Sequence, residues 1–426
     1  MNLAGTSPHT YIDHPSRLLR EAPLRDPRVV KLAKTIVGYS CSVKPGEKVL
    51  LEAFDIPADV VGIMVEEISA AGGVPMVHLR QNEVTRALLI NAKEETWKAH
   101  GAADLALMKE AQAYIALRGS NNVAEMSDVP NDAMQWYQSH YMQPVHFKRR
   151  ITHTKWCVLR WPTPSFAQQA GMSTRAFEDF YFEVCTMDYA KMAGAMKPLA
   201  DRMKKTNTVR IKAPETDLTM SIKGIPAIPC TGDKNIPDGE VFTAPVRNSV
   251  NGKIRFNAPT IYSGTRFENV RLEFRNGKVV NATSSDTKRL NEILDSDEGG
   301  RYLGEFAIGF HPLIKKPMLD ILFDEKIMGS LHMALGNAYD IADNGNKSKI
   351  HWDMVLIQTP EAGGGEIWFD EECIRRSGRF IVPDLECLNP ENLLGSPAPP
   401  KTSPFGSGGR EGTGSKKKER ATATRK

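Results

Sequence analysis

The chain has 426 residues, of which 41% are hydrophobic and 25% are charged, and its formal net charge is +4. This length exceeds one ordinary hydrophobic core, so we expect two domains, and the composition is that of a soluble globular protein. From Gly395 onward the chain carries eight basic and two acidic residues, a charge of +6, so subtraction from +4 leaves about −2 for the body. A body of this charge gives no indication of a nucleic-acid surface.

The cysteines and the amino terminus bear on the cellular compartment. The six cysteines are dispersed without a CxxC pair, which indicates reduced thiols in an intracellular protein: Cys41, Cys157, Cys185, Cys230, Cys373 and Cys387. The first residues are too polar for a signal peptide, and no run of about 18 uncharged apolar residues predicts a membrane span. We therefore expect a cytoplasmic protein.

The first half of the chain predicts an α/β domain over residues 27–189, after a polar arm at residues 1–26. Asp26-Pro27 is a helix start, and the following segments alternate between apolar strands and amphipathic helices. Such alternation favours a mostly parallel sheet covered by helices. Neither a GxGxxG nor a GxxxxGK[ST] motif is present, so this domain is interpreted as a scaffold. Its histidines are assigned surface or structural roles: His78, His100, His140, His146 and His153.

The second half predicts a mainly antiparallel β domain with a few helices over residues 190–394. Hairpin turns are expected at three dipeptides between β-rich runs: Asn251-Gly252, Asn276-Gly277 and Ser377-Gly378. The expected fold class is therefore α+β with two domains. The Pro, Gly, Ser and Lys-rich segment 395–426 predicts a disordered basic tail, in which KKKER is at most a weak polyanion-binding patch.

The stretch from His332 to Asp353 concentrates residues that bear chemistry. His351 and Asp353 would project from one face of an extended strand, with Trp352 on the other face. Imidazole nitrogen and carboxylate oxygen are suitable ligands for zinc, cobalt or manganese. The same two residues could also form an ordinary hydrogen-bonded pair beside a buried tryptophan.

Two further carboxylates occupy unusual local settings. Glu240 follows a Pro-Asp-Gly turn at the entrance to a strand, and Glu305 lies between Gly304 and the apolar run FAIGF. A carboxylate buried in apolar sequence must be paired, neutralised or bound to a metal, because burying it bare costs several kcal/mol. Glu305 is thus a better ligand candidate than the surface acids, although either glutamate alone could be structural.

Four motifs in this order and spacing resemble those of the thermophilic aminopeptidase T family of metallo-aminopeptidases: NIPDGEVFTAP, YLGEFAIGFHP, GSLHMALGNAY and KIHWDMV. The KPGEKVLLEA, AGGVPMV and WPTPSFAQQAGMSTRAFEDFYFEVC segments are similar to the amino-terminal half of that family, so the likeness extends from about Asp26 to Leu388. The resemblance implies a two-metal site with ligands at five positions: Glu240, Glu305, His332, His351 and Asp353. It also implies a catalytic role for Tyr339, and we interpret Glu305 as the carboxylate that bridges the two ions.

These residues lead to one expected function and two alternatives. The expected function is a peptidase that removes amino-terminal residues with two divalent ions, Zn²⁺, Co²⁺ or Mn²⁺. The family resemblance also implies a homodimer. The first alternative is a two-metal amidohydrolase acting on a specialised non-peptide amide. The second is a polyanion-binding or scaffold protein with an idle site, which the complete set of ligand types disfavours.

Overall fold

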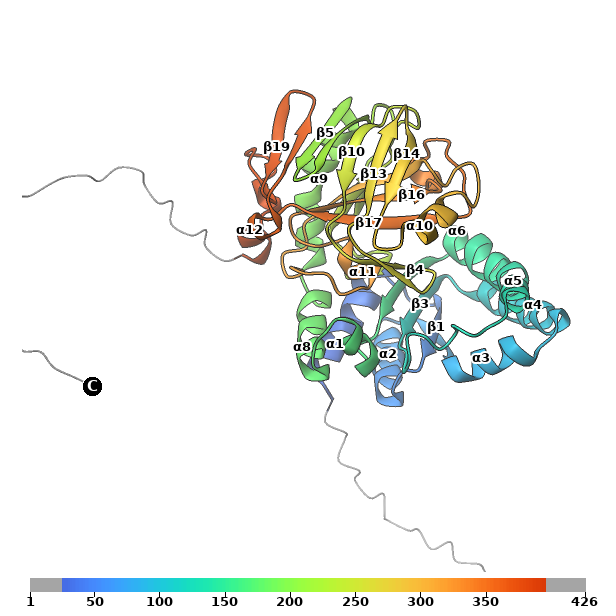
Figure 1. The fold of residues 1–426 in the computed structure, drawn as a ribbon. Coiled ribbons are helices and arrows are strands. Elements are labelled where there is room, and N and C mark those ends of the chain that lie inside the picture. Colours follow the sequence, from blue (N-terminus) through green and yellow to red (C-terminus); the bar gives the residue numbers. More distant parts are fainter. Residues whose placement is uncertain (1–24, 396–426) are drawn as a thin grey trace, which may run out of the picture.

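The computed structural model describes residues 25–395, which form an α/β half and a β-rich half (Figure 1). The expectations for residues 1–24 of the arm and 396–426 of the tail lie outside the described residues. In the first half, five strands form one parallel sheet in the order β2-β1-β3-β4-β8. They are β1 (Lys48–Phe54), β2 (Val74–Arg80), β3 (Ala113–Arg118), β4 (Lys155–Arg160) and β8 (Asn235–Ile236).

Helices cover both faces of the parallel sheet, because its strands carry apolar side chains on both sides. Val49 and Leu51 of β1 belong to a core shared with α1, η1, α2 and α8, whereas Leu50 packs with α4 and η2. No helix within residues 25–395 is both long enough and apolar enough to cross a bilayer. The helices of this half are α1 (Pro27–Lys34), η1 (Thr35–Ser40), α2 (Ala58–Ala70), α3 (Asn82–Asn91), α4 (Glu94–Glu110), α5 (Asn131–Tyr137), η2 (Gln138–Arg150), α6 (Ile151–His153), α7 (Pro164–Gln169), α8 (Thr174–Cys185) and α9 (Tyr189–Lys205).

The first helix begins where the sequence predicts. The Asp26 side chain accepts a hydrogen bond from the backbone N–H of Arg28 at 2.8 Å, and Pro27 occupies the first helical position. An aspartate cap satisfies one of the free N–H groups at a helix start, and proline has no N–H to leave unpaired there.

The β-rich half contains two large antiparallel sheets, here called sheet B and sheet C. Sheet B has the order β14-β13-β10-β6-β5-β18-β19-β20, and sheet C has the order β17-β16-β15-β9-β7. The strands of sheet B are β5 (Thr208–Ala213), β6 (Thr216–Ser221), β10 (Asn251–Arg255), β13 (Arg271–Arg275), β14 (Lys278–Thr283), β18 (Glu366–Phe369), β19 (Glu372–Arg376) and β20 (Arg379–Phe380). The strands of sheet C are β7 (Ile228–Cys230), β9 (Glu240–Thr243), β15 (Leu303–Gly309), β16 (Ser330–Gly336) and β17 (His351–Ile357).

Smaller elements complete this half, and the predicted α+β fold class is confirmed. A separate hairpin consists of β11 (Thr260–Tyr262) and β12 (Thr265–Phe267). The short helices are α10 (Thr287–Leu294), α11 (Ile321–Asp324), η3 (Asp340–Ala342), η4 (Pro360–Ala362), η5 (Glu386–Leu388) and α12 (Pro390–Leu394).

The two halves are connected by the segment that leads into sheet C. β8 comes from the second half of the sequence, yet it pairs in parallel with β4 of the first sheet. Only Pro237, Asp238 and Gly239 separate β8 from Glu240 at the start of β9. Glu240 is therefore positioned by the parallel sheet as well as by sheet C, and the domain division at residue 190 stays a prediction.

One of the three predicted hairpin turns is wrong. Asn276-Gly277 joins β13 to β14 and Ser377-Gly378 joins β19 to β20, as predicted. Asn251-Gly252 instead begins β10 and pairs with β6. A Cβ at Gly252 would lie 2.2 Å from the Asp217 carbonyl oxygen, so glycine there permits close approach of strands rather than a turn.

Candidate metal centre

Sheet C brings the five predicted ligand positions to one of its faces. Alternation along β15 sends Phe306 and Ile308 into the main core, while Glu305 and Ala307 face the other way. The ligands come from four adjacent strands: Glu240 begins β9, Glu305 lies in β15, His332 lies in β16, and His351 and Asp353 lie in β17.

The side chains meet closely at this face. His332 Nε2 lies 3.2 Å from Glu305 Oε1 and 3.5 Å from Glu240 Oε2. His351 Nε2 lies 3.4 Å from Glu305 Oε2 and 3.5 Å from Asp353 Oδ2. Each carboxylate oxygen of Glu305 therefore faces a different histidine, which places Glu305 between two groups of ligands.

Hydrogen bonds orient both histidines for binding a cation. His332 Nδ1 donates to the Glu325 carbonyl oxygen at 3.2 Å, and His351 Nδ1 donates to the Asn337 carbonyl oxygen at 2.8 Å. When each ring is neutral and Nδ1 carries the proton, the Nε2 lone pair points at carboxylate oxygens. A proton or a metal ion must then lie between Nε2 and these oxygens. Glu240 Oε2 and Asp353 Oδ1 are also buried without a hydrogen-bond partner. The donor set thus fits divalent metal ions.

The structure adds one acid that the sequence interpretation missed. Glu325, just after α11, joins Glu240 and His332 in one group of possible ligand atoms that lie within 4.8 Å of one another. Glu305, His351 and Asp353 form the second group. In sequence Glu325 stands in the charged run DEK, which is typical of an exposed surface, so only its seven-residue distance from His332 could have pointed to it.

Burial and ion pairing shift the pKa values at the site in opposite directions. Burial raises the pKa of Glu240, against the opposing charges of Lys326 and His332. Burial would also raise the pKa of Asp353, but His351 and His332 outweigh it and lower that pKa to about 2. Asp353 therefore remains an anion at any physiological pH.

Tyr339 lies at the edge of the site, before η3. Its ring centroid is 4.6 Å from that of His351 and 5.9 Å from that of Phe242, and the residue is 48% exposed. Desolvation, together with the charges of Glu305 and Asp353, raises the pKa of its hydroxyl well above the usual 10. The phenol stays protonated and can donate a hydrogen bond to a ligand.

Three more polar groups border the ligands. The Lys326 side chain is 1% exposed, contacts the Glu325 carboxylate, and places Nζ 3.5 Å from Glu240 Oε1. Cys230 and Asp238 form a third cluster of possible ligand atoms with Glu240. All six cysteines are free thiols, and Cys230 adjoins this site.

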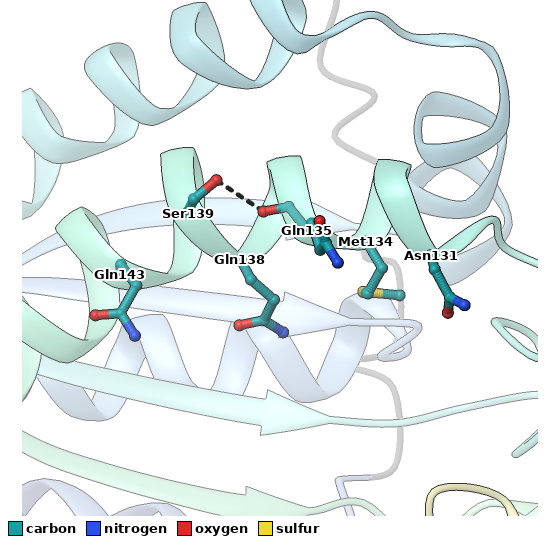
Figure 2. A pocket seen from close by; sticks show the side chains of 6 residues that line it. All are labelled: Asn131, Met134, Gln135, Gln138, Ser139 and Gln143. Carbon is teal, nitrogen blue, oxygen red and sulfur yellow. Dashed lines mark hydrogen bonds between the residues drawn. The ribbon is translucent and has the colours of Figure 1, made fainter. Parts of the chain in front are cut away.

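The α/β half contributes none of the three ligand clusters found within residues 25–395. A surface concavity of about 620 Å³ on α5 and η2 is lined by six uncharged side chains (Figure 2): Asn131, Met134, Gln135, Gln138, Ser139 and Gln143. None of them can act as an acid, a base or a strong metal ligand near pH 7, so this hollow offers no chemistry of its own.

The fold and the site define the class of protein. Residues 25–380 match the thermophilic metalloprotease family (M29), and the chain belongs to that family of metallopeptidases. Aminopeptidase T of Thermus thermophilus is 25% identical over 404 residues, which cover 83% of this chain and 98% of that protein. Aminopeptidase AmpS of Bacillus subtilis is 24% identical over 364 residues, covering 76% and 87% of the two chains. The predicted family and the predicted enzyme class are confirmed.

Solved structures support the same fold. Wild-type AmpT from Thermus thermophilus has a TM-score of 0.71 at 22% identity, over 84% of this chain and 99% of that chain. A 2,5-dihydroxypyridine dioxygenase from Pseudomonas putida KT2440 has a TM-score of 0.55 at 13% identity, over 85% and 100%. Because an oxygenase and an aminopeptidase share this architecture, the reaction must be argued from the site and not from the fold.

Proposed function

We propose that this protein is an aminopeptidase that releases amino-terminal residues from peptides with two divalent metal ions. The observation that carries the proposal is the pair of ligand groups at one face of sheet C, joined by the two oxygens of Glu305. Glu240, Glu325 and His332 would hold one ion, and Glu305, His351 and Asp353 would hold the other. Two ions held side by side supply a water nucleophile of lowered pKa and polarise the scissile carbonyl.

The charges of the ligands support two divalent ions rather than one. Four carboxylates, those of Glu240, Glu305, Glu325 and Asp353, balance the charge of two divalent cations. A buried set of four carboxylates around a single divalent ion would leave uncompensated negative charge. Oxygen and nitrogen ligands without thiolate favour Mn²⁺, Co²⁺ or Zn²⁺ as the metal.

Tyr339 would act on the substrate directly. Its protonated hydroxyl, beside His351, is available to donate a hydrogen bond to the oxyanion that forms when the peptide carbonyl is attacked. The runner-up function, a two-metal amidohydrolase for a specialised non-peptide amide, would use the same ligands.

The experiment compares amino-acid amides with their N-acetylated counterparts, before and after chelation and with Mn²⁺, Co²⁺ or Zn²⁺ restored. An aminopeptidase requires the free amine, so we expect turnover of the free amides alone, lost on chelation and regained with metal. Equal cleavage of the acetylated amides would favour the amidohydrolase. An absence of turnover with every metal would reject the proposal.

We further propose a cytoplasmic homodimer. The free thiols are compatible with a reducing compartment. Tyr339 beside the ligands is 48% exposed and Ile341, two residues further along the chain, is 60% exposed, and a second copy could cover them. Light scattering of the purified protein at micromolar concentration would give the mass of a single chain if the dimer proposal is wrong.

A further inference from the structure

Lys326 is a buried cation inside an acidic site. Its backbone carbonyl accepts from the His311 N–H at 2.9 Å, and its own N–H donates to the Phe323 carbonyl at 3.1 Å. His311 lies two residues after the end of β15, so the lysine backbone is tied close to the strand that carries Glu305. The fold therefore fixes the position of the lysine backbone, and the surrounding protein leaves its side chain only 1% exposed.

The cluster of Cys230, Asp238 and Glu240 would otherwise suit a third ion. Their ligand atoms lie within 4.8 Å of one another, and Asp238 and Glu240 are 1% and 5% exposed. Cys230 stands opposite Glu240 in the β7–β9 ladder. A thiol with two carboxylates is a ligand set for zinc or cobalt.

The ammonium of Lys326 already forms an ion pair with one carboxylate of this cluster. It contacts the Glu325 carboxylate and lies 3.5 Å from Glu240 Oε1, and Glu240 shares the cluster with Asp238 and Cys230. Glu240 thus stands between Lys326 on one side and His332 on the other, with Nε2 of the histidine 3.5 Å from its second oxygen.

We propose that Lys326 is the resident cation of the Cys230, Asp238 and Glu240 cluster, where it holds Glu240 toward the metal ligands and excludes a third divalent ion. The inference rests on the proposed two-metal function. Asp238 joins the four ligand carboxylates, so five carboxylates face two divalent ions and one ammonium, and these charges sum to zero.

Replacing Lys326 changes this balance in a defined way. In Lys326→Ala a third divalent ion restores neutrality if Cys230 binds it as a thiolate and releases its proton to solvent. Lys326→Met removes the charge but keeps most of the side-chain volume, so it leaves no room for an ion. It is the matched control.

Metal titration with Co²⁺, followed by metal analysis and absorption spectroscopy, tests the proposal. We expect Lys326→Ala to bind one more ion per chain than the wild type and to gain a thiolate-to-cobalt charge-transfer band in the near ultraviolet. Lys326→Met should gain neither, and adding Cys230→Ser to Lys326→Ala should remove the band. An unchanged stoichiometry and spectrum in Lys326→Ala would overturn the proposal.

A second measurement does not depend on the folding of the lysine variants. In an otherwise wild-type chain, Cys230→Ser should leave the number of bound ions unchanged, because Lys326 already occupies that cluster. A loss of one ion, or a thiolate-to-cobalt band in the wild type, would show that the cluster is itself a metal site and overturn the role of Lys326. If the wild type binds fewer than two ions per chain, the proposed two-metal function is wrong. The difference in the number of bound ions between the wild type and Lys326→Ala still tests the role of the lysine.

Discussion

Glu305 differs from the other acids of the site because its two oxygens point to different histidines. Oε1 lies 3.2 Å from His332 Nε2, and Oε2 lies 3.4 Å from His351 Nε2. A carboxylate in this position contacts both groups of ligands, so its removal should weaken the binding of both ions. Loss of Asp353 should weaken the binding of mainly one ion.

Glu305→Gln therefore tests the bridging position. The amide keeps the volume but carries no charge, so we expect metal content to fall from two ions to one or none and activity to fall by at least about 10²-fold. Metal analysis after dialysis and amide hydrolysis measure the two effects, with circular dichroism to check folding. A fully active, fully metallated Glu305→Gln would exclude the bridge.

A change at Tyr339 should lower the catalytic rate without lowering the metal content. Tyr339→Phe keeps the ring against His351 and removes only the hydroxyl donor. We expect kcat to fall by about 10² to 10³ with metal content unchanged, as is common on removal of an oxyanion donor. If kcat stays within twofold of the wild type, Tyr339 is a packing residue.

His146 gives a pH dependence outside the metal site. Burial lowers its pKa from 6.5 to about 4, partly offset by Glu52, so the ring is neutral in the folded protein. In the unfolded chain the imidazole takes up a proton below about pH 6.5, whereas in the folded chain it does so only near pH 4. The free energy of unfolding therefore decreases as the pH falls from about 6.5 to about 4, by at most roughly 3 kcal/mol. Urea unfolding of His146→Gln between pH 4 and 7 should show a weaker pH dependence than that of the exposed-site control His153→Gln.

At the scale of elements, β15 shows what the sequence can and cannot predict. The apolar FAIGF run makes Glu305 a ligand candidate, and the family resemblance implies the other ligands. The register between β15 and β16 shifts between Leu303 and Glu305, and this irregularity sends Leu303 to the core face and Glu305 to the metal face. No local pattern predicts the shift. Glu325 was missed for a related reason, because tertiary contacts bring to the site an acid that lies in a charged run.

Gly304 makes the shift in β15 possible. A Cβ at Gly304 would lie 2.4 Å from the Asn337 carbonyl oxygen and 2.5 Å from that of Gly336. We expect Gly304→Ala to lower stability by about 1–3 kcal/mol and to weaken metal binding, because the strand must move and carries Glu305 with it. Gly194→Ala, in helix α9 with open space around the glycine, should be neutral or slightly stabilising. Equal effects of the two changes in denaturant unfolding would contradict this account.

At the scale of the whole molecule, the metal site lies beside the connection between the parallel sheet and sheet C. The sequence predicts two domains, but not that the two-residue strand β8 returns to the first sheet directly before Glu240. A strand this short has no periodicity to recognise. Contacts between residues distant in sequence thus hold the ligands of the site. The net charge of the site should therefore affect the stability of the whole fold.

Removal of metal should consequently destabilise the entire chain. Without the ions, the buried carboxylates repel one another and must be protonated or hydrated, each at a cost in folding free energy. We expect a chelator to lower Tm by several degrees, and Mn²⁺ at about 100 times its Kd to restore about 2.7 kcal/mol for each ion bound. Differential scanning calorimetry measures the shift, and Glu305→Gln should show a smaller response because it binds fewer ions and buries one charge less. The same Tm with chelator and with Mn²⁺ would mean that the acidic cluster is stable on its own, and the two-metal assignment would lose its electrostatic basis.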